Sequence, residues 1–327
     1  MFLGIRRDEV NHLLRKMSRN SCQDFAKVEL KSMFTELTFN IIMRMVAGKR
    51  YYGYGGDVKD EEEARQFREI IKEAFANAGM SNPGECVPLL WWIDPGGLEK
   101  RLMGLGKKID AFLEGLIDEK RNSQEKGNTM IDHLLSLQTS QPEYYTDQII
   151  KLLILVLILA GTNTSATTLE WAMSNLLNNP DKLKKARAEL DSEIGQEKLM
   201  DEPDVFKLHY LQNIISKTLR LYPAAPLLQP VHMASKDCTI GGYEVPSKTI
   251  VLFNAWAIHR DPKCGMMQPV LIWRGSLIQC FEWKRFDEAE VDMAEGHGVT
   301  MPKAAPLEAM CRARPIMNKD LSESVDV

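Results

Sequence analysis

Small and hydroxyl-bearing residues interrupt an apolar stretch near the middle of the chain. The apolar run 152–160 leads into residues 161–165, Gly-Thr-Asn-Thr-Ser. These residue types weaken a helix interior, yet apolar residues recur at helical spacing over 169–178, and Pro180 ends the run. The pattern predicts one long helix with a polar, loosened middle turn that a ligand or water could approach. The alternative is a buried helix whose Thr hydroxyls bond back to carbonyls one turn earlier.

Four blocks downstream of this helix carry a family resemblance. They are residues 208–213 (Leu-His-Tyr-Leu-Gln-Asn), 217–226 (Lys-Thr-Leu-Arg-Leu-Tyr-Pro-Ala-Ala-Pro), 237–246 and 254–262. In this order and spacing they resemble the cytochrome P-450 superfamily, the haem-thiolate monooxygenases. The resemblance is to the plant microsomal group that includes flavonoid and isoflavone hydroxylases.

The resemblance implies both a fold and a reaction. The expected fold is mainly α with small β-sheets, an incomplete cytochrome P-450 fold. The implied reaction inserts one oxygen atom from O2 into a hydrophobic, flavonoid-like or isoflavonoid-like plant metabolite. The implied cofactor is haem, and the implied partners are that small hydrophobic substrate and an NADPH-dependent reductase that supplies the electrons. Family members work at the cytosolic face of the endoplasmic reticulum membrane.

Site residues follow from the same resemblance, position by position. Thr164 matches the hydroxyl that guides protons to iron-bound oxygen, and Asn163 stands where many members have a carboxylate, although an amide relays protons less readily than an acid. The positions that match cofactor-binding residues are Ala160, Gly161, Arg220 and His232. The positions that match substrate-lining residues are Ala224, Ala225, Pro226, Leu227, Leu228, Val299, Thr300 and Met301.

The loop that carries the iron ligand in this family has no counterpart here. In the family, the ligating Cys lies in a Phe-x-x-Gly-x-Arg-x-Cys-x-Gly loop, and its thiolate pushes electron density toward oxygen-bond cleavage. The resemblance stops at Lys263 and resumes at Gly275, and residues 264–274 contain neither this loop nor the Pro-Glu-Arg-Phe segment before it. Of the six cysteines, Cys264 is a remote substitute, and Cys280 is expected to pack among apolar neighbours. We therefore assign no metal ligand and expect this chain not to bind haem.

A second departure concerns charge. The family carries a buried Glu-x-x-Arg ion pair before Pro223, whereas this chain reads Lys217-Thr218-Leu219-Arg220. Removing one partner of a buried pair costs about 3 to 5 kcal/mol. Apolar residues around Lys217 lead us to expect its side chain beside the apolar face of its helix, close to Arg220. The alternative is that Lys217 turns outward and Arg220 finds another acceptor.

Composition and the remaining patterns fit a globular protein. Lys and Arg number 41 against 45 for Asp and Glu, which gives no indication of a nucleic-acid partner. No signal peptide or anchor is recognised before Phe2, and run 152–160 falls short of the roughly 20 residues that a membrane span needs. We expect that run to be a buried helix and the protein to be cytosolic if it is stable.

The coarse organisation is predicted from periodicity and turn residues. Strands are expected only after Pro226, with a hairpin over 239–245 around two glycines, a partner strand over 249–253 and a last small sheet over 299–314. The expected regions are 1–263, a helical body with a hairpin sheet that lacks the anchor and first helices; 264–274, an atypical joint; and 275–327, a C-terminal helix and small sheet. Helices are expected over 2–20, 28–47, 61–78, 98–121, 130–138, 146–178, 181–194 and 204–222.

Two functional hypotheses remain open from the sequence. The first is a fragment of a haem-dependent monooxygenase that is inactive as it stands. The second is a non-catalytic polypeptide, either a truncated or misspliced product or a scaffold that pairs with an intact relative.

Overall fold

A computed structural model describes residues 2–53, 58–80, 97–123, 127–228, 232–261 and 274–317. The chain divides into two compact units. The first unit comprises Met1–Leu13 and Ser32–Ala166, and the second comprises Leu14–Lys31 and Thr167–Val327. The helices that have residues in both units are α1 (Leu3–Ser21), α2 (Leu30–Ala47) and α7 (Asp147–Leu177).

The first unit is helical, and capping residues define where its helices begin. The Asp60 side chain accepts a hydrogen bond from the Glu63 N–H at 2.9 Å, which fixes the start of α3. Thr129 and Asp132 form a capping box that starts α6. The helices that lie wholly in this unit are α3 (Glu61–Asn77), α5 (Leu98–Asn122) and α6 (Met130–Ser140).

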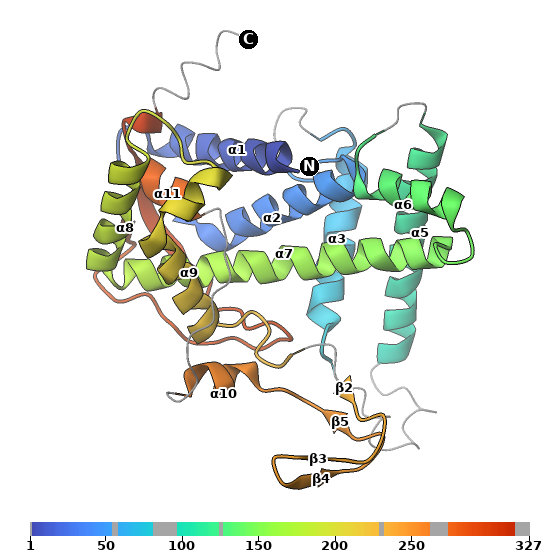
Figure 1. Cartoon of the computed structure of the whole chain (residues 1–327). Helices are drawn as coiled ribbons and strands as arrows, with labels where there is room; N and C mark the ends of the chain where they lie inside the picture. Colours follow the sequence, from blue (N-terminus) through green and yellow to red (C-terminus); the bar gives the residue numbers. More distant parts are fainter. Residues whose placement is uncertain are drawn as a thin grey trace. The chain divides into compact units, whose positions relative to one another are not determined.

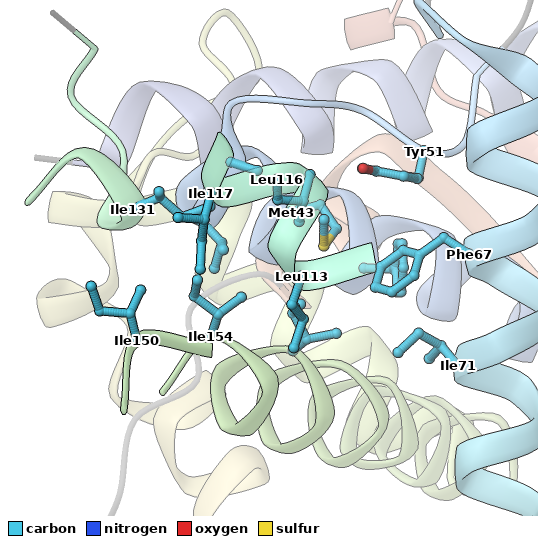
Figure 2. Packing of buried hydrophobic residues seen from close by; sticks show 14 of the residues in the cluster. Met43, Tyr51, Phe67, Ile71, Leu113, Leu116, Ile117, Ile131, Ile150 and Ile154 are labelled. Atoms are coloured by element: carbon cyan, nitrogen blue, oxygen red, sulfur yellow. The ribbon is translucent and has the colours of Figure 1, made fainter. Parts of the chain in front are cut away.

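Apolar side chains from these helices meet in one core cluster (Figure 2). The Phe67 ring of α3 stacks on the Phe112 ring of α5, with the ring centroids 3.6 Å apart. Ile150 and Ile154 of α7 bring the long helix into the same cluster. Burial of these side chains is the main source of stability in the unit.

Helix α7 is unbroken along its whole length (Figure 1), as the sequence predicts. The expectation that run 152–160 is buried is wrong for one face of the helix. Ile150, Ile154 and Ile158 are fully buried, but Leu152 is 48% exposed and Val156 is 61% exposed. We call the exposed residues the α7 stripe; they are Ile149, Leu152, Leu153, Val156 and Leu157.

Helix α7 has the length and composition of a membrane span but packs in a protein core on one face. Among the described residues, α7 is the helix that is long and apolar enough to cross a membrane, although length and composition alone are weak evidence for a span. Its buried face packs in a protein core, as in an ordinary helix of a folded domain.

The second unit contains a three-stranded antiparallel sheet in the order β1-β7-β6. Its strands are β1 (Ala26–Glu29), β6 (Phe281–Arg285) and β7 (Glu308–Ala313). The expectation of strands only after Pro226 is therefore wrong, because Ala26 pairs with Cys311 across most of the chain length. The helices of this unit are α8 (Pro180–Glu193), η2 (Glu202–Lys207), α9 (His209–Leu221), α10 (Ala255–Arg260) and α11 (Arg274–Cys280).

Two smaller sheets lie in the second unit. The predicted hairpin is confirmed as β3 (Cys238–Ile240) and β4 (Tyr243–Val245), joined by Gly241 at φ 61° and Gly242 at φ 88°. The strand expected over 249–253 forms as β5 (Ile250–Val251), but the expectation that it partners the hairpin is wrong, because it pairs with β2 (His232–Met233) in a separate sheet. The predicted joint over 264–274 lies outside the described residues except at Arg274, so the division into three regions stays a prediction.

Candidate functional site

The polar turn of α7 lies in the first unit and keeps regular helical bonding. The Thr164 hydroxyl donates to the Ala160 carbonyl at 2.5 Å, and the Thr162 hydroxyl donates to the Ile158 carbonyl at 2.8 Å. This is the back-bonded arrangement that the sequence left open as an alternative. Each hydroxyl oxygen can still accept a hydrogen bond, so the arrangement does not remove Thr164 from a proton relay. Asn163 is half-buried beside it.

Gly161 has a packing role in this structure. A Cβ atom at Gly161 would lie 2.6 Å from the Ile42 Cδ1 atom of α2. The Thr38 hydroxyl of α2 also donates to the Thr162 carbonyl at 3.1 Å. The missing side chain therefore lets α2 approach α7 closely, while the family role of giving oxygen room stays a prediction.

Lys217 and Arg220 lie on α9, in the second unit. Lys217 is exposed, and the Arg220 Nη1 donates to the His259 carbonyl at 2.8 Å. The expectation that Lys217 lies beside the apolar face is wrong, and the alternative is correct. The physical reason is that a long, flexible ammonium side chain stays in water at little cost, whereas burial without a partner is expensive.

His232 lies on β2 and is exposed. Its ring meets the Phe253 ring edge to face, with the ring centroids 5.7 Å apart. The assignment of His232 and Arg220 to cofactor contacts stays a prediction.

The first substrate-lining segment, residues 224–228, is held by the chain around α10. The Leu228 N–H donates to the Phe253 carbonyl at 3.0 Å, and the Trp256 N–H donates to the Pro226 carbonyl at 3.1 Å. Leu227 and Leu228 are 42% and 46% exposed and therefore offer apolar surface. Ala224, Ala225 and Pro226 are half-buried.

The second substrate-lining segment, residues 299–301, lies in the same unit. Val299 is 41% exposed, Thr300 is half-buried and Met301 is 4% exposed. The structure thus places both segments in the second unit and the polar turn of α7 in the first. That the turn and the two segments face one pocket stays a prediction.

Two residues missed by the sequence analysis support the second segment. The Trp171 Nε1 donates to the Met301 carbonyl at 2.7 Å, and the Glu170 Oε1 accepts from the Leu307 N–H at 2.9 Å. Both side chains are buried. The available signal was a Glu-Trp pair followed by the apolar helical spacing of the last turns of α7, because a buried carboxylate requires a hydrogen-bond donor.

The described cysteines do not suit a haem iron. A ligand thiolate forms readily where the pKa of the thiol is lowered, but burial raises the pKa of Cys311 to about 11. Cys280 is fully buried at the end of α11, as expected, and Cys22 and Cys238 are exposed. Cys86 and Cys264 lie outside the described residues. In the part of the chain that the structure describes, no cluster of His, Cys, Asp and Glu could hold a metal ion.

Comparison with known proteins gives consistent matches. The family model for cytochrome P450 matches residues 2–264. Cytochrome P450 81Q32 of Catharanthus roseus is 52% identical over 359 residues, covering 99% of this chain and 71% of that protein. Isoflavone 3'-hydroxylase of Medicago truncatula is 51% identical, covering 97% of this chain and 71% of that protein.

A relative named for a different activity also aligns. (+)-Piperitol/(+)-sesamin synthase CYP81Q2 of Sesamum radiatum is 48% identical, covering 100% of this chain and 71% of that protein. The family model covers most of the chain, and the relatives are about half identical along nearly all of it. Together with the helical architecture and small antiparallel sheets, these matches show that the chain belongs to the cytochrome P450 family.

Proposed function

We propose that this chain descends from a plant monooxygenase of the isoflavone-hydroxylase kind and is non-catalytic as it stands, because it cannot present a thiolate to haem iron. The observation that carries the proposal is the absence of the family's cysteine loop between Lys263 and Gly275. Cys311, the described cysteine with a shifted pKa, is shifted away from thiolate formation.

The comparisons support a loss of residues somewhere in this chain. The family model stops matching at residue 264, while the relatives align across nearly the whole chain. The alignment with the Catharanthus relative runs over 359 residues, although this chain has 327 in all. The relative therefore carries residues that have no counterpart in this chain.

The substrate side of the protein supports an aromatic, hydrophobic ligand. The relatives include an isoflavone 3'-hydroxylase and an isoflavone 2'-hydroxylase. In this chain, Leu227, Leu228 and Val299 supply exposed apolar surface in the second unit. Apolar walls with few polar groups suit a planar phenolic molecule.

A second function, that of a scaffold which pairs with an intact relative, is favoured by one observation. The α7 stripe is an apolar face whose side chains are 38% to 61% exposed. Exposed apolar stripes of this kind mark interaction surfaces or aggregation sites. From the family we also propose an NADPH-dependent reductase as the partner of the intact enzyme and the endoplasmic reticulum membrane as its location.

Reconstitution of the reaction tests the proposed function. The chain is mixed with haem, an NADPH-dependent P450 reductase, NADPH, O2 and an isoflavone, and the Medicago isoflavone 3'-hydroxylase serves as the positive control. We expect no hydroxylated product above the reductase alone, because oxygen activation in this family requires the ligated thiolate. Product that depends on this chain and falls in Thr164→Ala would overturn the proposal and restore the enzyme.

A further inference from the structure

Trp171 makes two contacts that a packing role alone does not require. Its indole Nε1 donates to the Met301 carbonyl at 2.7 Å. Its ring stacks on the Tyr222 ring, with the centroids 4.1 Å apart and the planes at 11°. Trp171 is fully buried, so both contacts are shielded from water.

These contacts reach both segments that are assigned to the substrate. Met301 ends the segment 299–301, and Tyr222 lies immediately before Pro223 and the segment 224–228. A single rigid side chain therefore touches the end of one segment and the residue that leads into the other. All these residues belong to the second unit.

Glu170, the neighbour of Trp171 on α7, holds the chain that follows Met301. Glu170 is 1% exposed, and its carboxylate accepts from the Leu307 N–H at 2.9 Å. Burial raises the pKa of Glu170, and the Leu307 N–H partly offsets that effect. Lys303 lies between Met301 and Leu307 in the sequence. Its ammonium is 4.8 Å from the Trp171 ring centroid and donates a hydrogen bond to the Asp292 carbonyl.

Residues 294–304 also form hydrogen bonds with one another. The Gly296 N–H donates to the Pro302 carbonyl at 2.8 Å, and the Ala304 N–H donates to the Ala294 carbonyl at 2.9 Å. Segment 294–304 is thus a compact turn. Trp171 of α7 bonds to this turn at Met301, and Glu170 bonds to Leu307, three residues after the turn ends.

We infer that Trp171 and Glu170 are positioning residues: together they set where the main chain of 299–301 lies relative to the start of 224–228, and thereby the fit of a planar aromatic substrate between the two segments. The inference rests on the proposed function for the assignment of these segments to the substrate. The positioning itself rests only on the contacts described above.

Trp283 provides a matched control for Trp171. It is also a buried tryptophan, 7% exposed, and its Nε1 donates to the Leu277 carbonyl at 2.9 Å. Within the described residues, no hydrogen bond or ring contact joins Trp283 to either substrate segment. Phe at either position removes one buried N–H donor to a main-chain carbonyl, so the two variants should lose comparable stability.

Amide hydrogen exchange tests the positioning. We expect Trp171→Phe to speed exchange across residues 299–307 by about tenfold, the effect of losing one buried hydrogen bond. Trp283→Phe should leave these amides unchanged. Equal exchange over 299–307 in the two variants would overturn the inference.

Glu170 gives a second test that does not depend on the fold surviving loss of Trp171. Glu170→Gln keeps an oxygen that accepts from the Leu307 N–H, whereas Glu170→Leu removes the acceptor at similar volume. We expect rapid exchange at Leu307 in Glu170→Leu and protection in Glu170→Gln. Equal protection in both variants would show that the carboxylate holds nothing in place.

Ligand affinity separates the inference from the proposed function. Equilibrium dialysis with an isoflavone should show binding to the unsubstituted chain, about tenfold weaker binding to Trp171→Phe, and unchanged binding to Trp283→Phe. Failure of the unsubstituted chain to bind would overturn the substrate assignment in the proposed function, and the exchange comparison would still decide the positioning. Equal affinity of all three chains would overturn the link between Trp171 and substrate fit.

Discussion

Inserting the haem loop of an isoflavone hydroxylase, with the segment that precedes it, between Lys263 and Gly275 should raise haem binding above the background level that we expect of the unchanged chain. The insertion supplies the shielded thiolate that the described cysteines cannot offer. Binding would also stabilise the fold, because a ligand that binds only the folded state shifts the unfolding equilibrium. Haem per polypeptide, measured as the pyridine haemochromogen, gives the result.

A matched insertion isolates the ligand. The same graft with serine at the loop cysteine keeps its length and shape but removes the thiolate. We expect this control to retain little haem. Equal haem in the two grafts would mean that another group holds the iron, and a failure of both would place the defect outside residues 263–275.

Adding Lys217→Glu to the graft tests the second departure from the family. Lys217 is exposed and Arg220 already donates to the His259 carbonyl, so the new carboxylate gains only an i, i+3 surface pair. Such a pair contributes about 0.2 to 0.5 kcal/mol. We therefore expect the double change to incorporate about as much haem as the graft alone. A large gain would show that Arg220 needs a carboxylate partner.

The α7 stripe should make the protein prone to associate, and a charge placed on it should reduce that association. Val156 is 61% exposed, so Val156→Glu should change the free energy of unfolding by no more than about 0.5 kcal/mol. The same substitution removes apolar surface from the centre of the stripe. We expect a larger monomeric fraction by size-exclusion chromatography with light scattering.

Ile154→Glu is the matched control on the opposite face of the same helix. Ile154 is fully buried in the core cluster (Figure 2), so an unpaired carboxylate there should cost roughly 3 to 5 kcal/mol and unfold the first unit. If Val156→Glu destabilised the protein as much as Ile154→Glu, the stripe would be a buried surface. If it left association unchanged, another surface would drive it.

Most helices could be predicted from the sequence because their apolar periodicity is local. Helix α7 is the best example, since Pro180 and the spacing after Leu169 predict its continuation through the polar turn. Strand β1 could not be predicted in this way. Its last two residues, Val28 and Glu29, read as the start of the helix expected over 28–47, and the segment forms a strand because Ala26 pairs with Cys311, a partner far along the chain.

In the candidate site, too, features set by local sequence could be predicted and features set by tertiary contacts could not. Thr164 and the two apolar segments were predicted from family motifs, whereas the bond from Trp171 to Met301 depends on tertiary packing. Lys217 was placed wrongly because helical spacing shows which residues are neighbours but not whether a long side chain turns toward water. The exposed face of α7 was missed because an apolar run has no polar side to mark which face is covered.

The carbon monoxide spectrum of the reduced chain tests the central claim most directly. The purified chain is incubated with haem, reduced with dithionite and exposed to carbon monoxide, with the Medicago isoflavone 3'-hydroxylase as the reference. We expect no thiolate-type Soret band, because no described cysteine offers a shielded thiolate and the family's loop is absent from the sequence. A thiolate-type band that disappears in Cys264→Ala or Cys280→Ser would contradict the account and identify the ligand.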